Sequence, residues 1–265
     1  MFRVKLSENT ERPPKPAARY LWAAALAALL AIALFLVWPA FLAPAPARPT
    51  AGADLYSEAY LRHLETTKPV NPARFTGDPY AFYAAHPDQL GPTSPGAVCA
   101  IKYLAPDRRA YRIADYRTAT AAIADGAHIT HAGRCGTCSD LKDLAVYLRR
   151  PDLTTPVRRC AMLGAVKPLA MRCLQNLGFT PACAETWYAN ARNTGRRCYA
   201  VCIRSWASGE PSNRPDGRLN TCLACDEAAS GPVFKQVAGR TRRNSGIVTS
   251  IGRGAGEVFA VTHDY

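Results

Sequence analysis

Ten cysteines are the residues of this 265-residue sequence with the clearest capacity for chemistry. Thiols form structural disulfides, exchange disulfides with a substrate, or bind a metal ion as thiolates. Their number is even, so five disulfides are possible, and an oxidising compartment would favour that outcome. Their spacing does not give the pairing. We predict that all ten form structural disulfides: Cys99, Cys135, Cys138, Cys160, Cys173, Cys183, Cys198, Cys202, Cys222 and Cys225.

Two of these cysteines have a spacing that also suggests catalysis. The segment Cys135-Gly-Thr-Cys138 lies between a predicted strand at 127–131 and a helix predicted to open at Ser139 or Asp140. This junction resembles that of thioredoxin-like oxidoreductases, which place a thiolate at the N-terminus of a helix, where its pKa is lowered. The resemblance implies an alternative function, thiol-disulfide exchange with Cys135 and Cys138 as the catalytic residues.

Metal binding is a third interpretation of the same segment, because His128, His131, Cys135 and Cys138 have ligand-like spacing. Two histidines at i and i+3 of a strand point to opposite faces of the sheet. An exported thiolate site must also compete with oxidation. We therefore expect neither a metal site nor a cofactor.

Adjacent carboxylates follow the last pair of cysteines. The segment Cys222-Leu-Ala-Cys225-Asp-Glu227 resembles the catalytic-glutamate segment of invertebrate-type lysozymes. The resemblance implies a second alternative, glycan cleavage with Glu227 as the general acid. Neighbouring residues of a helix do not face each other, so Asp226 and Glu227 do not form a catalytic pair, and the sequence places no second carboxylate.

An arginine-rich loop between Gly239 and Gly246 is the predicted ligand contact. Guanidinium groups bind phosphate and carboxylate through two parallel hydrogen bonds, and glycines free the backbone at both ends of the loop. The alternative is that these arginines satisfy backbone carbonyls. The predicted ligand-contact residues are Arg240, Arg242, Arg243, Asn244 and Ser245, with His131 and Asp226 as further candidates.

The elements that position these residues form an α+β domain, mostly helical and disulfide-rich, with a small β element. Alternation predicts strands at 99–104, 110–113, 127–131 and 257–263. Helices are predicted at 54–65, from Asp115 to Gly126, from Ser139 or Asp140 to Leu148, from Thr155, from Thr180 to about Trp206 with an interruption near Gly195, and after Asn220.

An uncharged apolar run from Tyr20 to Ala43 is long enough to cross a bilayer as a helix. Positive charge is concentrated before it, so the N-terminus should stay in the cytosol. We therefore predict a cytosolic tail at 1–19, a transmembrane helix at 20–43, a Pro/Ala linker at 44–53 and an exported cysteine-rich domain at 54–265, periplasmic or lumenal. The alternative is a signal peptide cleaved near Ala45 or Ala47.

The charge of the exported part indicates an anionic partner. The first 19 residues contain five basic and two acidic side chains, so the rest of the chain carries +10 of the net charge of +13. Outside the cytosol, nucleic acid is not an expected partner. An anionic envelope polymer or a lipid headgroup suits the location, in addition to the membrane contact through residues 20–43.

The exported pattern as a whole resembles a family of uncharacterised membrane-anchored proteins. The resemblance covers Cys99 to Tyr265 and rests on the segments at 131–141, 222–227 and 239–247. It implies a common domain and supplies no activity. The resulting hypothesis is a single-pass, membrane-anchored, disulfide-stabilised cell-envelope domain that binds or processes an anionic ligand.

Overall fold

The computed structural model describes residues 55–91, 94–247, 249–252 and 258–265. The chain divides into two units, Met1–Pro49 and Thr50–Tyr265, and every described residue belongs to the second. The predicted tail, transmembrane helix and linker lie outside the described residues. Within the described part of the chain, no helix combines the length and apolar character that a membrane crossing requires.

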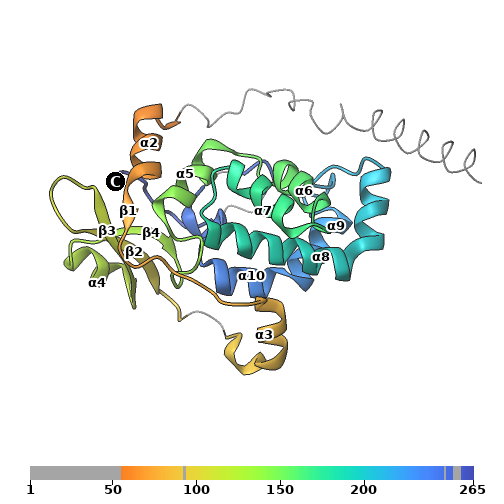
Figure 1. Cartoon of the computed structure of the whole chain (residues 1–265), viewed down its shortest axis with the longest axis horizontal. Coiled ribbons are helices and arrows are strands. Elements are labelled where there is room, and N and C mark those ends of the chain that lie inside the picture. Colours follow the sequence, from red (N-terminus) through yellow and green to blue (C-terminus); the bar gives the residue numbers. More distant parts are fainter. Residues whose placement is uncertain (1–54, 92–93, 248, 253–257) are drawn as a thin grey trace, which may run out of the picture. The chain divides into compact units, whose positions relative to one another are not determined.

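The second unit is an α+β domain in which a small sheet lies at one side and most of the helices lie at the other (Figure 1). The fold class predicted for this part of the chain is confirmed. The strands are β1 (Lys68–Pro69), β2 (Val98–Tyr103), β3 (Ala110–Tyr116) and β4 (His128–Ala132). The helices are α2 (Glu58–Thr66), α3 (Pro79–Ala85), α4 (Ala119–Ala124), α5 (Leu141–Arg149), α6 (Thr154–Met162), α7 (Lys167–Asn176), α8 (Pro181–Ala207), α9 (Thr221–Ala229) and α10 (Gly231–Ala238), with 3-10 turns η2 (Pro87–Gln89) and η3 (Arg243–Ser245).

The sheet has the strand order β1-β3-β2-β4. β1 runs parallel to β3, while β2 pairs antiparallel with both β3 and β4. The predicted helix start at Asp115 is wrong, because Asp115 is paired with Cys99 inside the sheet. The cap of α4 is instead Thr118, whose hydroxyl accepts a hydrogen bond from the Ala121 amide at 3.2 Å.

Two of the predicted helix starts are confirmed by their capping residues, whereas the predicted cap Thr155 is wrong, because it lies inside α6. The Thr180 hydroxyl accepts from the Cys183 amide at 3.3 Å, with Pro181 in the first turn. The Asn220 side chain accepts from the Leu223 amide at 2.8 Å. The predicted interruption near Gly195 is wrong, since α8 runs unbroken from Pro181 to Ala207.

Helix α5 lies at the centre of the hydrophobic core. Nearly every residue from Leu141 to Leu148 is buried, so the helix has no broad solvent face. It packs beside α2, while β2 and β3 contribute buried Ile101 and Tyr111, and the helical part contributes Leu174 and Phe179. The core therefore joins the sheet to the helices as one body.

Five disulfides link the elements of the domain, as the sequence predicted. The bridges are Cys99–Cys135, Cys138–Cys183, Cys160–Cys173, Cys198–Cys225 and Cys202–Cys222. No described cysteine is free. Two of the bridges join α8 to α9, so this helical hairpin is tied twice along its length.

The C-terminal segment returns to the sheet, but not as the predicted strand. Residues 258–263 have no strand pairing. Side chains attach the segment instead: the Tyr265 hydroxyl donates to the Ile129 carbonyl at 2.9 Å, and His263 Nε2 donates to the Ser245 carbonyl at 2.7 Å. Within 258–263 only His263 is buried, so the alternation in the sequence corresponds neither to alternating burial nor to a ladder.

Candidate anion-binding cleft

The loop after α10 is built on a close approach of two backbone segments. Gly239 ends α10 with φ of +70°, and a Cβ at this position would lie 2.4 Å from the Gly136 amide nitrogen. The amides of Thr137 and Cys138 donate to the carbonyls of Val237 and Ala238, both at 2.9 Å. The arginine loop is therefore fixed against the segment that carries Cys135 and Cys138.

Arg240 lies inside the protein and not in a ligand site. Its side chain is fully buried. The guanidinium donates to the carbonyls of Cys138 at 3.0 Å, Thr130 at 3.1 Å and Ser139 at 3.3 Å. We therefore correct the expectation that Arg240 contacts a ligand: it binds one backbone carbonyl of the edge strand β4 and two carbonyls just before α5.

Three more of the predicted contact residues fasten the loop to itself and to neighbouring elements. Arg242 donates to the carbonyls of Tyr147 and Arg150, and burial lowers its pKa to about 10. The Asn244 amide donates to the Ala132 and Gly239 carbonyls, at 2.8 and 2.7 Å. Ser245 is buried beside Arg240. Their principal contacts are structural.

Arg243 is the loop arginine that lines a cleft. This cleft has a volume of about 900 Å³ and lies between the end of β4, α10 and the C-terminal segment. Lys235 of α10 and Arg134 also line it. Arg243 and Lys235 both contact one carboxylate oxygen of Glu227, at 3.5 and 3.1 Å. Glu227 therefore orients both cations, although it does not itself line the cleft.

The lining of this cleft combines cations with an apolar wall. Leu90, Pro95, Val98, Ile129 and Phe259 supply apolar surface, and none of the described lining residues is acidic. An apolar wall with a few convergent polar groups is the usual composition of a ligand site. The sequence did not single out Arg134 or Lys235, although Arg134 stands directly before Cys135 and its charge was visible there.

Asp226 and Glu227 point to different partners. Asp226 accepts hydrogen bonds from Thr194 and, at 3.2 Å, from Asn190, and burial raises its pKa. Ser230 belongs to the same polar network, because its hydroxyl lies 2.8 Å from that of Thr194. Glu227 is held by its two cations. This arrangement does not provide the facing carboxylates of a glycosidase.

His131 is part of the buried core. Its Nδ1 donates to the Ala132 carbonyl at 2.9 Å. Because a neutral imidazole carries only one proton, its Nε2 then accepts from the Ser139 hydroxyl at 2.8 Å. That hydroxyl accepts in turn from the Gly136 amide. Burial, with the charge of Arg240 nearby, lowers the pKa of His131 to about 3. The neutral ring is a structural link and no ligand reaches it in this fold.

The proposed redox pair is not a pair in the structure. Cys135 is bonded to Cys99 of β2, and Cys138 to Cys183 of α8. A dithiol oxidoreductase needs its two cysteines to bond to each other in the oxidised state. We therefore correct the assignment of Cys135 and Cys138 as catalytic residues. Among the described residues there is also no cluster of three or more histidine, cysteine or acidic groups able to hold a metal ion.

The described residues form a disulfide-rich α+β domain with a cleft that three cationic side chains line. Residues 167–261 match the model of a family of unknown function, DUF8771. This match agrees with the resemblance to an uncharacterised family, over a shorter range than the sequence suggested. No curated protein and no solved structure matches the chain.

Proposed function

We propose that this chain is a membrane-tethered domain that binds an anionic polymer of the cell envelope in the cleft beside Arg243. The observation that carries the proposal is the lining of the cleft, in which Arg134, Lys235 and Arg243 stand beside an apolar wall without a described acidic residue. Guanidinium and ammonium groups bind carboxylate and phosphate groups through charge-assisted hydrogen bonds.

The location outside the cytosol is supported by two features. The apolar run at 20–43 with positive charge before it favours an anchor whose C-terminal side is exported. The five disulfides of the described domain suit an oxidising compartment. Polymers that carry carboxylates or phosphates are the anions a tethered envelope domain meets at close range.

A polymer fits the cleft better than a small ion does. Its volume of about 900 Å³ lies near the upper end of the range for ligand sites, about 300–1,000 Å³. Sugar rings pack against apolar and aromatic surface such as Phe259 and Ile129, while charged substituents reach the cations. The proposed function is therefore binding of the polymer and not its chemical conversion.

The test compares two neighbouring arginines of the loop. We expect Arg243→Ala to weaken binding of solubilised peptidoglycan, a carboxylated glycan, by about tenfold or more, since a hydrogen bond to a charged group contributes about 1.5–3 kcal/mol. Its melting temperature should stay close to that of the unchanged chain. Arg242→Ala should lower the melting temperature, because two carbonyls lose their donor, and leave the affinity of the folded protein nearly unchanged.

The measurement is calorimetric titration of the purified full chain, with neutral dextran as the matched control polymer. Affinity should also fall as salt concentration rises. Equal affinity for dextran and peptidoglycan, or unchanged binding by Arg243→Ala, would overturn the proposed function.

A further inference from the structure

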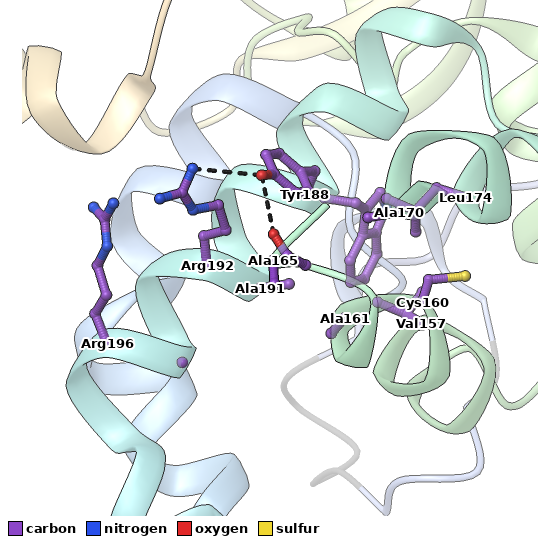
Figure 2. Close-up of a pocket in the computed structure, with 13 residues that line it drawn as sticks. Val157, Cys160, Ala161, Ala165, Ala170, Leu174, Tyr188, Ala191, Arg192 and Arg196 are labelled. Atoms are coloured by element: carbon purple, nitrogen blue, oxygen red, sulfur yellow. Dashed lines mark hydrogen bonds between the residues drawn. The ribbon is translucent and has the colours of Figure 1, made fainter. Parts of the chain in front are cut away.

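A second cavity lies among the helices, with no lining residue in common with the cleft. It has a volume of about 350 Å³ and opens between α6, the α6–α7 turn and α8 (Figure 2). The cavity exists because small residues face each other across it: Ala161, Gly164 and Ala165 on one side, and Ala191 and Gly195 of α8 on the other. Larger side chains at these positions would close the gap.

The floor of this cavity is apolar and rigid. Val157, Ala170, Leu174 and the Trp187 ring line it. The Cys160–Cys173 bridge joins α6 to α7 directly beneath, and Cys160 itself is part of the lining. A preformed apolar floor favours a hydrocarbon group, since such a group enters without ordering the protein.

The rim on the α8 side is cationic. Tyr188, Arg192 and Arg196 are spaced four residues apart, so they follow one face of the helix (Figure 2). Arg192 lies against Tyr188, with Nη1 3.4 Å from the tyrosine hydroxyl. The Arg196 side chain is exposed and makes no hydrogen bond or ion pair with any residue the structure describes. Nor is any described residue of the lining acidic.

The rim on the α6–α7 side is apolar and exposed. Met162, Leu163, Val166 and Leu169 stand within one short segment with exposed fractions of 56, 38, 50 and 52%. They directly adjoin the lining residues Ala161, Gly164, Ala165 and Ala170. A cluster of large exposed apolar side chains beside a cavity marks an interaction site.

We propose that this cavity binds a single-chain anionic amphiphile, with its aliphatic chain on the apolar floor and its carboxylate or phosphate group on Arg192 and Arg196. The two guanidinium groups match either headgroup. The volume lies near the lower limit for ligand sites, which suits one aliphatic segment better than the two chains of a bilayer lipid. The apolar rim continues the surface along which the chain enters.

The test uses Trp187 as a contact reporter. The chain has four tryptophans, so Trp22→Phe, Trp38→Phe and Trp206→Phe leave Trp187 as the single one. This full chain is titrated in nanodiscs of zwitterionic lipid with three brominated single-chain amphiphiles, which quench tryptophan on contact: a fatty acid, a lysophosphatidic acid and a lysophosphatidylcholine. The first two differ in the headgroup, and the third is the zwitterionic control.

We expect saturable quenching by one or both anionic amphiphiles. The amphiphile that reaches half-maximal quenching at the lower concentration carries the preferred headgroup. The double variant Arg192→Gln, Arg196→Gln should raise the concentration needed for half-maximal quenching about tenfold or more. Arg197→Gln is the matched control, because Arg197 neighbours Arg196 in α8 but does not line the cavity. It should leave the titration unchanged.

Filling the cavity is the second arm. A Cβ built at Gly195 meets no atom within 4 Å, so Gly195→Leu places a side chain in open space without disturbing the helix. Quenching should be lost in Gly195→Leu and kept in Gly195→Ala. Equal quenching by the lysophosphatidylcholine, an unchanged half-saturation in the double arginine variant, or full quenching of Gly195→Leu would each overturn the proposal. Near-ultraviolet circular dichroism verifies that every variant keeps the native fold.

Discussion

Arg240 lies at the centre of a buried group of titratable side chains, and their pKa values move in opposite directions. Burial raises the pKa of Asp140 to about 6 and that of Asp143 to about 7. Burial lowers the pKa of His131 to about 3 and that of His263 to about 4. The folded protein therefore favours the neutral form of all four groups, while Arg240 keeps its charge.

These shifts have opposite effects on the pH dependence of stability. The carboxyls bind protons more tightly in the folded chain, so the stability that they contribute is full below about pH 4 and is lost as the pH rises towards 6 or 7. The histidines bind protons less tightly when folded. Their contribution is full above about pH 6.5 and is lost as the pH falls.

We predict that Asp143→Asn exposes the histidine effect. Removing a carboxyl with a raised pKa should make the free energy of unfolding increase more steeply with pH than in the unchanged chain, by up to about 1.4 kcal/mol per pH unit between about pH 4 and 7. Denaturant unfolding at several pH values measures this slope. Asp88→Asn, at an exposed turn, is the control, and a parallel pH profile for Asp143→Asn would show that Asp143 does not hold its proton.

Residue types and local spacing predicted some of the side-chain roles and not others. The bonding of all ten cysteines was predicted from their even number and from the oxidising compartment that the sequence suggests. The helix caps Thr180 and Asn220 were predicted from local residue types. The role of Arg240 did not, because its three carbonyl partners lie about a hundred residues earlier in the chain. Burial of a charged residue depends on such long-range partners, and the loop's charge alone suggested an exposed site.

The α8–α9 hairpin shows how two covalent links act on one pair of elements. Cys202–Cys222 closes a loop of 20 residues inside the larger loop closed by Cys198–Cys225. When one bridge is present, the cysteines of the other are already held near each other in the unfolded chain. The second bridge therefore closes a shorter circuit than the first and removes somewhat less entropy.

We predict that each of these two bridges stabilises the domain even when the other is present. Replacing Cys202 and Cys222 by alanine, or Cys198 and Cys225, should each lower the free energy of unfolding by about 2.5 kcal/mol, the loop-closure value for the circuit of about eight residues that the second bridge closes. Replacing all four should lower it by about 6 kcal/mol, because the loop of about 20 residues is then open as well. Guanidinium denaturation of the oxidised variants measures these values, and a loss below about 1 kcal/mol from either pair would contradict this explanation.

Element boundaries were predictable where a local signal marks the start or the end of an element. Thr180-Pro181 marks the start of α8, and Gly126 follows the end of α4. The extension of β3 through Asp115 was not predictable, since it depends on pairing with β2 and on the Cys135 amide, which donates to the Asp115 carboxylate at 2.6 Å. Gly195 suggested a helix break, yet packing against α7 and the bridges to α9 keep α8 continuous.

At the scale of the molecule, the pairing of the cysteines is the most direct prediction. The full chain isolated without reductant should take up no alkylating reagent when denatured, and ten equivalents after reduction. Mass-spectrometric peptide mapping should find Cys135 linked to Cys99 and Cys138 linked to Cys183. A Cys135–Cys138 link would contradict this fold and restore the oxidoreductase hypothesis.

The order of the bridges along the chain bears on biogenesis. Cys138–Cys183 encloses Cys160–Cys173, and Cys198–Cys225 encloses Cys202–Cys222. An oxidase that joined each cysteine to the next one in the sequence would form only Cys99–Cys135 correctly. The other eight sulfurs would be mispaired, so any such pairing in sequence order must be corrected by thiol-disulfide exchange before the native bridges form.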